Sequence, residues 1–193
     1  MVSPVAPIPA AIGCRSHSGW AVIVAVTGSP AAPRVLERRR IQLVDGSLPT
    51  QPYHAAAEAG LSLAEGTSLI RDVEAVSATS ALAALAKLAA DVHTNGFSVA
   101  GVAVVAADRA LPPELERILS SHALLHSAEG DLYEQALTEG AARAGLPVMR
   151  VTAGSIPINS SLETAGRTLG PPWQKDHKLA ARAAMWLLMT APP

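Results

Sequence analysis

The fold is decided by the stretch Ala10-Ala11-Ile12-Gly13-Cys14-Arg15-Ser16-His17-Ser18-Gly19-Trp20 and by the apolar run that follows it, residues 21–26. Its apolar ends and small polar centre predict a strand over 10–15, a tight turn over 16–19 and a second strand over 20–27. A turn rich in Gly and Pro follows at 28–33, and residues 34–44 are predicted to form a third strand. The three strands make an antiparallel meander. The third belongs at a sheet edge because its segment 37–40 is polar on both faces.

The rest of the chain alternates between helical patterns and short apolar strands. Residues 97–106 are almost entirely apolar, which is typical of a central strand buried on both faces. Apolar residues recur at helical spacing over 63–92 and again over 126–144. The remaining expected elements are short helices over 53–59 and within 112–119, a strand over 147–151, a polar loop over 152–171 and a last helix over 173–190.

This order of elements, β-β-β-α-β-α-β-α, predicts an α/β fold. A mixed five-stranded sheet with helices on both faces buries every apolar surface that the pattern creates. We expect a single domain over residues 1–193, in which residues 1–9 form a flexible N-terminus.

Composition limits the classes of function. The formal net charge is −1, which does not favour a dedicated nucleic-acid binder, although it leaves nucleic acid as a possible partner. The single cysteine, Cys14, excludes an internal disulfide and is expected to be a small core side chain. A reducing, cytoplasmic location fits this cysteine usage. We expect no signal peptide, no membrane span and no membrane partner.

Three segments carry a resemblance to a known family. The first segment, residues 12–20, matches an opening strand and turn. The second matches a helix and the strand after it, and it covers residues 129–148, from Glu129-Gly130-Asp131-Leu132-Tyr133 to Leu146-Pro147-Val148. The third matches a last helix and covers residues 173–184, beginning Trp173-Gln174-Lys175-Asp176-His177-Lys178. Together with the element order, they resemble the ribonuclease-H-like fold, and within it the Holliday-junction resolvase (RuvC) type. The resemblance implies a bacterial nuclease fold in which acidic residues on the first strand, the fourth strand and the last helix hold two Mg²⁺ ions.

This sequence departs from the pattern at those acidic positions. Arg15 stands where the first-strand acid is expected, and a guanidinium repels the ions that should bind there. The fourth strand carries no acid until Asp108, just past its end, and only Asp176 lies in a plausible place on the last helix. We therefore expect a catalytically degenerate protein, a pseudoenzyme that acts as a binding or interaction module, with a homodimer as a possible assembly. No cofactor is expected for such a module.

A divergent metal-dependent nuclease or phosphate-ester hydrolase is the alternative. Its catalytic candidates are Asp108, Glu129, Asp176 and His17, and its metal candidates are Asp108, Asp176 and His177, with Mg²⁺ or Mn²⁺ as the ion only in this case. His126 shares a helix face with Glu129 and is a further candidate nearby. The simpler interpretation is that these groups lie at helix starts, where acids favour the helix dipole, and that His54 hydrogen-bonds locally.

A second alternative is an actin-like nucleotide or anion binder. Arg15, Ser16 and Ser18 could cradle a phosphate or carboxylate together with the backbone of the small-residue turn. A nucleotide binder also needs a second phosphate loop, and the segment 106–109 has no glycine to form one. The run Arg38-Arg39-Arg40 could contact a nucleic-acid backbone, but on an edge strand it is more often a solvated feature that prevents aggregation.

Overall fold

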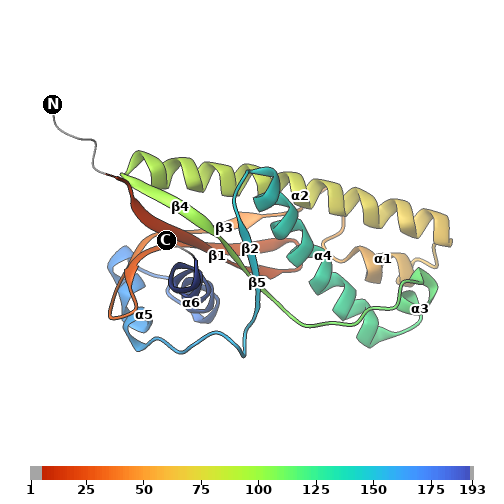
Figure 1. The fold of residues 1–193 in the computed structure, drawn as a ribbon. Coiled ribbons are helices and arrows are strands. Elements are labelled where there is room, and N and C mark those ends of the chain that lie inside the picture. Colours follow the sequence, from red (N-terminus) through yellow and green to blue (C-terminus); the bar gives the residue numbers. More distant parts are fainter. Residues whose placement is uncertain (1–5, 192–193) are drawn as a thin grey trace.

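The computed structural model describes residues 6–191 and contains a five-stranded sheet between two layers of helices (Figure 1). The elements in chain order are β1 (Ile8–His17), β2 (Trp20–Ser29), β3 (Ala32–Gln42), α1 (Pro52–Glu58), α2 (Leu63–Thr94), β4 (Phe97–Ala106), α3 (Leu115–Leu119), α4 (His122–Arg143), β5 (Val148–Thr152), α5 (Ser160–Ala165), the 3-10 helix η1 (Gly166–Leu169) and α6 (Lys175–Thr190).

The strands are arranged in the order β3-β2-β1-β4-β5. β1 pairs with β2, and β2 with β3, in antiparallel fashion, whereas β1–β4 and β4–β5 are parallel. The predicted mixed five-stranded sheet is therefore confirmed, and β3 lies at an edge as expected. β1 and β4 lie in the middle because they are apolar on both faces, and helices cover both of those faces.

Each face of the sheet has its own core. On one face, Ile12 and Cys14 of β1 pack with residues of α2 and α4, and burial raises the pKa of the Cys14 thiol. On the other face, Ala11 of β1 and Val105 of β4 pack with the alanine-rich helix α6. Alternate residues of one strand thus serve two cores, as strand geometry requires.

Small residues let two of the helices come close to their neighbours. A Cβ atom added at Gly13 of β1 would overlap the carbonyl oxygen of Ala180 in α6, so this position accepts only glycine. A Cβ atom at Gly140 of α4 would lie 2.7 Å from the Cβ of Ala81 in α2. These contacts fix the distance of α6 from the sheet and of α4 from α2.

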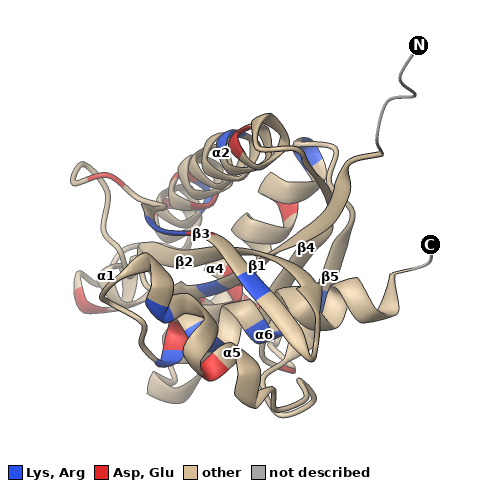
Figure 2. Ribbon diagram, turned by 90° about the vertical axis from the view of Figure 1, so that its left-hand side faces the viewer, with Lys and Arg blue, Asp and Glu red and all other residues tan. Residues whose placement is uncertain are grey.

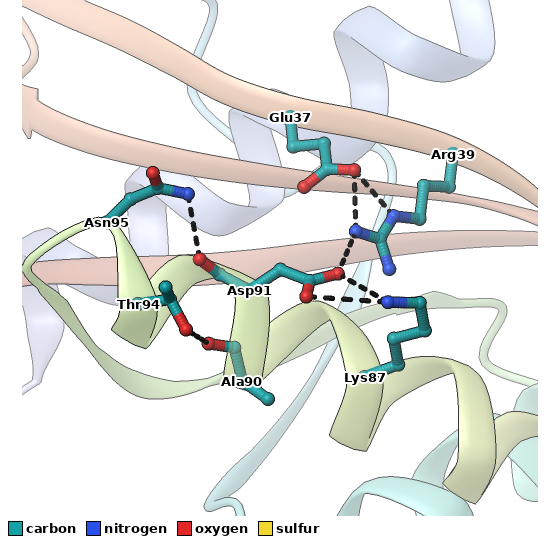
Figure 3. Close-up of polar contacts among 7 residues, drawn as sticks. All are labelled: Glu37, Arg39, Lys87, Ala90, Asp91, Thr94 and Asn95. Atoms are coloured by element: carbon teal, nitrogen blue, oxygen red, sulfur yellow. Dashed lines mark hydrogen bonds and ion pairs between the residues drawn. The ribbon is translucent and has the colours of Figure 1, made fainter.

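An ion-pair network joins the edge strand β3 to the end of α2 (Figure 3). The Arg39 side chain donates to Glu37 at 2.7 Å and to Asp91 at 2.6 Å, and Lys87 donates to the same Asp91 at 3.0 Å. The hydrogen bonds from Arg39 and Lys87 lower the pKa of Asp91. The Arg39 side chain thus lies on the α2 side of the sheet, so Arg38, Arg39 and Arg40 do not form one basic patch.

Helix α2 is the only helix in residues 6–191 that is long and apolar enough to cross a membrane. Its buried side chains, among them Ile70, Val73, Leu85 and Leu88, belong to the core shared with the sheet and α4. A core helix of a folded domain passes the same test of length and composition, so α2 is only weak evidence for a membrane span.

Several expected boundaries are wrong. The segment 152–171 is not one loop, because Asn159 caps α5 and Leu162 of α5 is buried, and η1 follows directly. Helix α4 begins at His122, one turn before the expected start at 126, and α6 begins at Lys175, which leaves Trp173 outside it. Of the N-terminus expected to be flexible, residues 1–5 lie outside the described residues, whereas Ile8 and Pro9 already pair with β4.

Candidate functional site

The place where the resemblance puts a catalytic centre lies between the end of β1 and the start of α6. Gly13, Arg15 and His17 alternate along β1 and point to the α6 face of the sheet. Gly13 contacts Ala180, and His17 Nε2 lies 3.1 Å from a carboxylate oxygen of Asp176 one turn earlier in α6. Arg15 stands between them and therefore faces the first turns of α6.

A stack of side chains extends this site across β2 to β3. The His17 ring lies parallel to the Trp20 ring, with centroids 4.2 Å apart and an interplanar angle of 12°. The Arg40 guanidinium lies over the same Trp20 ring, 4.1 Å from its centroid. Arg15, Val22 and Arg40 are cross-strand neighbours in the register, so both arginines lie on the same face of the sheet. We call Arg15, His17, Trp20 and Arg40 the basic face.

Basic and acidic residues lie close together on the elements around α5 and α6 (Figure 2). The Arg38 guanidinium donates to the carbonyl oxygens of Gly170 and Pro171, each at 2.7 Å, and so anchors the segment before α6. His177 Nδ1 accepts a hydrogen bond from the backbone N–H of Gln174. Burial, and then the positive charge of Arg38, lower the pKa of His177, which favours a neutral imidazole there.

The acids proposed for a hydrolase are distributed over different parts of the structure. Asp108 is exposed and makes no ion pair within residues 6–191. Asp176 pairs with His17 on the α6 side, whereas Glu129 belongs to α4 on the opposite side of the sheet and binds His54. In the described part of the chain, no group of three ligand atoms from acidic, His or Cys side chains includes any of these carboxylates. The residues at the end of β1 therefore do not fit a pair of Mg²⁺ ions, which require clustered carboxylates.

Arg15, Ser16 and Ser18, which were predicted to bind an anion together, do not all lie on one face of the sheet. Ser16 is buried and pairs with Ala21 of the α2–α4 core, whereas Arg15 pairs with Val22 of the α6 core. Their side chains point to opposite faces, so Arg15 and Ser16 do not share one anion. Ser18 lies in the turn before Gly19, where its side chain is half-buried. An anion bound by Arg15 would therefore contact the basic face and not Ser16.

Glu129 is held at the junction of α1 and α4. It is 2 % exposed, and its Oε1 atom accepts hydrogen bonds from the backbone N–H groups of Tyr53 and His54. Burial raises the pKa of Glu129, and the hydrogen bonds from His54 and Tyr53 partly offset that rise. Its role here is to cap α1, which the sequence did not predict.

A second buried acid, Glu134, was missed by the sequence analysis. Its Oε2 atom accepts hydrogen bonds from Arg109 at 2.7 Å and from the backbone N–H of Ala107 at 3.2 Å, and Arg150 lies 3.6 Å away. Glu134 thus ties the segment after β4 to α4. Its position within the apolar stripe of α4, directly after Tyr133, is the signal that could have revealed it.

Comparison with solved structures defines the class of fold. The chain has the ribonuclease-H-like fold of the RuvC type. It is similar to a structure of RuvC from Thermus thermophilus, with a TM-score of 0.50, 14% identity, and coverage of 94% of this chain and 97% of that chain. It is also similar to T. thermophilus RuvC in complex with a Holliday junction substrate, with a TM-score of 0.52, 12% identity, and coverage of 95% and 97%. No protein-family model matches the sequence, and no curated protein matches it.

Proposed function

We propose that this protein is a non-catalytic binding module with a RuvC-type fold, and that its ligand is the phosphate backbone of a nucleic acid. The observation that carries the proposal is the replacement of a carboxylate site by a cationic one. Arg15 and His17 occupy the end of β1, and the acid next to them, Asp176, is already paired with His17. Such a site repels divalent ions and attracts phosphate.

The basic face offers charged contacts to the phosphates of a nucleic acid. Arg15 and Arg40 lie two strands apart, so their backbones are about 10 Å from each other by the usual strand spacing. Arg15 makes no ion pair within the described residues, and Arg40 is exposed, so both guanidiniums are available to phosphates. The Trp20 ring is covered by His17 on one face and by the Arg40 guanidinium on the other, so its role is to hold these two side chains in position.

The likeness to T. thermophilus RuvC in complex with a Holliday junction substrate supports a four-way junction as the first ligand to test. The net charge of −1 predicts modest affinity, because only the local face attracts the backbone. We expect a dissociation constant in the micromolar range at low salt, and a slope of log K against log salt near −2 for about two phosphate contacts.

The test is fluorescence anisotropy with a labelled four-way junction, a duplex and a single strand. Arg15→Ala and Arg40→Ala are each expected to weaken binding by about 10- to 150-fold, since a charged hydrogen bond contributes roughly 1.5–3 kcal/mol. Each is also expected to reduce the salt slope by about one. Arg71→Ala is the matched control, because it removes the same charge from the exposed surface of α2. Absence of binding at low salt, or equal weakening by Arg71→Ala, would contradict the proposed ligand.

A further inference from the structure

Three histidines meet where α1 contacts the first turns of α4. They are His54 of α1 and the pair His122 and His126, which are four residues apart on one face of α4. One side-chain nitrogen of each lies within 4.8 Å of the other two. This histidine cluster lies on the α4 side of the sheet, whereas the basic face lies on the α6 side. It is therefore a separate feature from the proposed nucleic-acid site.

The cluster has the dimensions of a metal site. His122 Nε2 and His126 Nε2 are 3.0 Å apart, and the His54 ring centroid lies 4.7 Å from that of His126. Two nitrogens on one tetrahedral Zn²⁺ lie about 3.3 Å apart, given zinc–nitrogen bonds of 2.0–2.1 Å. Small rotations of His122 and His126, both of them exposed, are enough to reach that spacing.

The buried carboxylate of Glu129 contacts one of the two ring nitrogens of His54. His54 Nδ1 lies 3.3 Å from Glu129 Oε1, which fixes that nitrogen as the donor and leaves Nε2 with a free lone pair. His54 Nε2 is itself buried and has no hydrogen-bond partner in the part of the chain that the structure describes. A carboxylate that orients a histidine by its other nitrogen is the usual outer partner of a zinc-binding histidine.

We propose that His54, His122 and His126 bind one divalent transition-metal ion of the zinc class. Three imidazole nitrogens suit Zn²⁺, Co²⁺ or Ni²⁺, whereas Mg²⁺ and Ca²⁺ prefer oxygen ligands. The two histidines at i and i+4 supply ligands from one helix face, and His54 brings the third from another helix. Three protein ligands leave a fourth coordination position for water or an anion. The bound ion would join α1 to α4.

Zinc binding to the tag-free, metal-stripped full chain is the test. We expect one Zn²⁺ per chain by calorimetry, and a rise in Tm of about 5 °C or more when free Zn²⁺ exceeds its Kd a hundredfold. Co²⁺ is expected to show the visible absorption bands of a tetrahedral site, and Mg²⁺ is expected to cause neither effect. The Co²⁺ spectrum reports the ligand geometry independently of stability.

Variants separate this site from incidental binding. His122→Ala and His126→Ala change exposed residues, so both variants should still fold. Loss of a residue that only hydrogen-bonds to a metal ligand typically weakens metal binding by roughly 10- to 100-fold. Each of these variants loses a ligand itself and should weaken Zn²⁺ binding by more than that. Glu129→Gln keeps an acceptor for the backbone of α1 and is expected to weaken binding by about tenfold. His93→Ala, at an exposed position near the end of α2, is the control and should bind like the wild type.

Two results would overturn the proposal: no stoichiometric Zn²⁺ binding by the wild type, or a His122→Ala/His126→Ala double variant that binds Zn²⁺ as the wild type does. Arg15→Ala is expected to retain full Zn²⁺ affinity, because the basic face lies across the sheet. The zinc site and the nucleic-acid site can therefore fail independently of each other.

Discussion

Replacing Gly13 by valine is expected to destabilise the protein more than any other single change considered. Gly13 lies in β1, and a side chain there would meet the backbone of Ala180 in α6 rather than a movable side chain. The helix would have to move away from the sheet, which removes the contacts of the whole α6 core. Overpacking of a core lowers the free energy of unfolding by about 3 kcal/mol when the obstacle is backbone, and Tm should therefore fall by roughly 10 °C.

Thermal unfolding followed by circular dichroism measures this effect. Gly154→Val is the matched control, since no atom lies within 4 Å of the added Cβ and the position is exposed. Its Tm should stay within about 2 °C of the wild-type value. A Gly13→Val protein as stable as Gly154→Val would mean that α6 does not lie as close to β1 as the structure shows.

The second large effect is expected for Glu134→Ala. This carboxylate is 1 % exposed and accepts hydrogen bonds from Arg109 and from the backbone of Ala107. Its removal leaves the backbone N–H of Ala107 and the Arg109 guanidinium without this acceptor, whereas Arg150 keeps its ion pair with Asp131. We expect a loss of roughly 2–3 kcal/mol, below the 3–5 kcal/mol of a fully buried pair, because both arginines reach water.

Chemical denaturation should show that loss as a lower midpoint with an unchanged slope. Hydrogen exchange is expected to show faster exchange at Ala107, whose amide loses its acceptor. Glu139→Ala, on the exposed side of the same helix, should change stability by no more than about 0.5 kcal/mol. Equal effects at the two positions would show that Glu134 does not hold the end of β4.

Much of the fold could be predicted from short-range patterns. The apolar runs on either side of the polar turn at 16–19, and the almost entirely apolar run at 97–106, predicted strands that the structure confirms. The helices α5 and η1 were missed because they are short and polar, and only one side chain of α5, Leu162, is fully buried. Such elements are stabilised by tertiary contacts, which a single sequence does not display.

The candidate site was predictable only in part. The resemblance over residues 12–20 singled out Arg15 as the residue at the position of the first-strand acid, but which helix covers that face follows only from the packing of the structure. The contacts of His17 with Asp176, and of His54 with Glu129, join residues far apart in the chain. Neither histidine differs from an ordinary surface histidine in its local sequence, so its partner depends on how the helices pack.

The most direct test of the central claim is a cleavage assay. A labelled four-way junction is incubated with the full chain and Mg²⁺ or Mn²⁺, and bound and cut DNA are measured in the same samples. We predict that the junction is bound but stays intact, since Arg15 and His17 occupy the end of β1 and, within residues 6–191, no carboxylates cluster there. Metal-dependent cleavage by the wild type that Asp176→Ala abolishes would contradict the account.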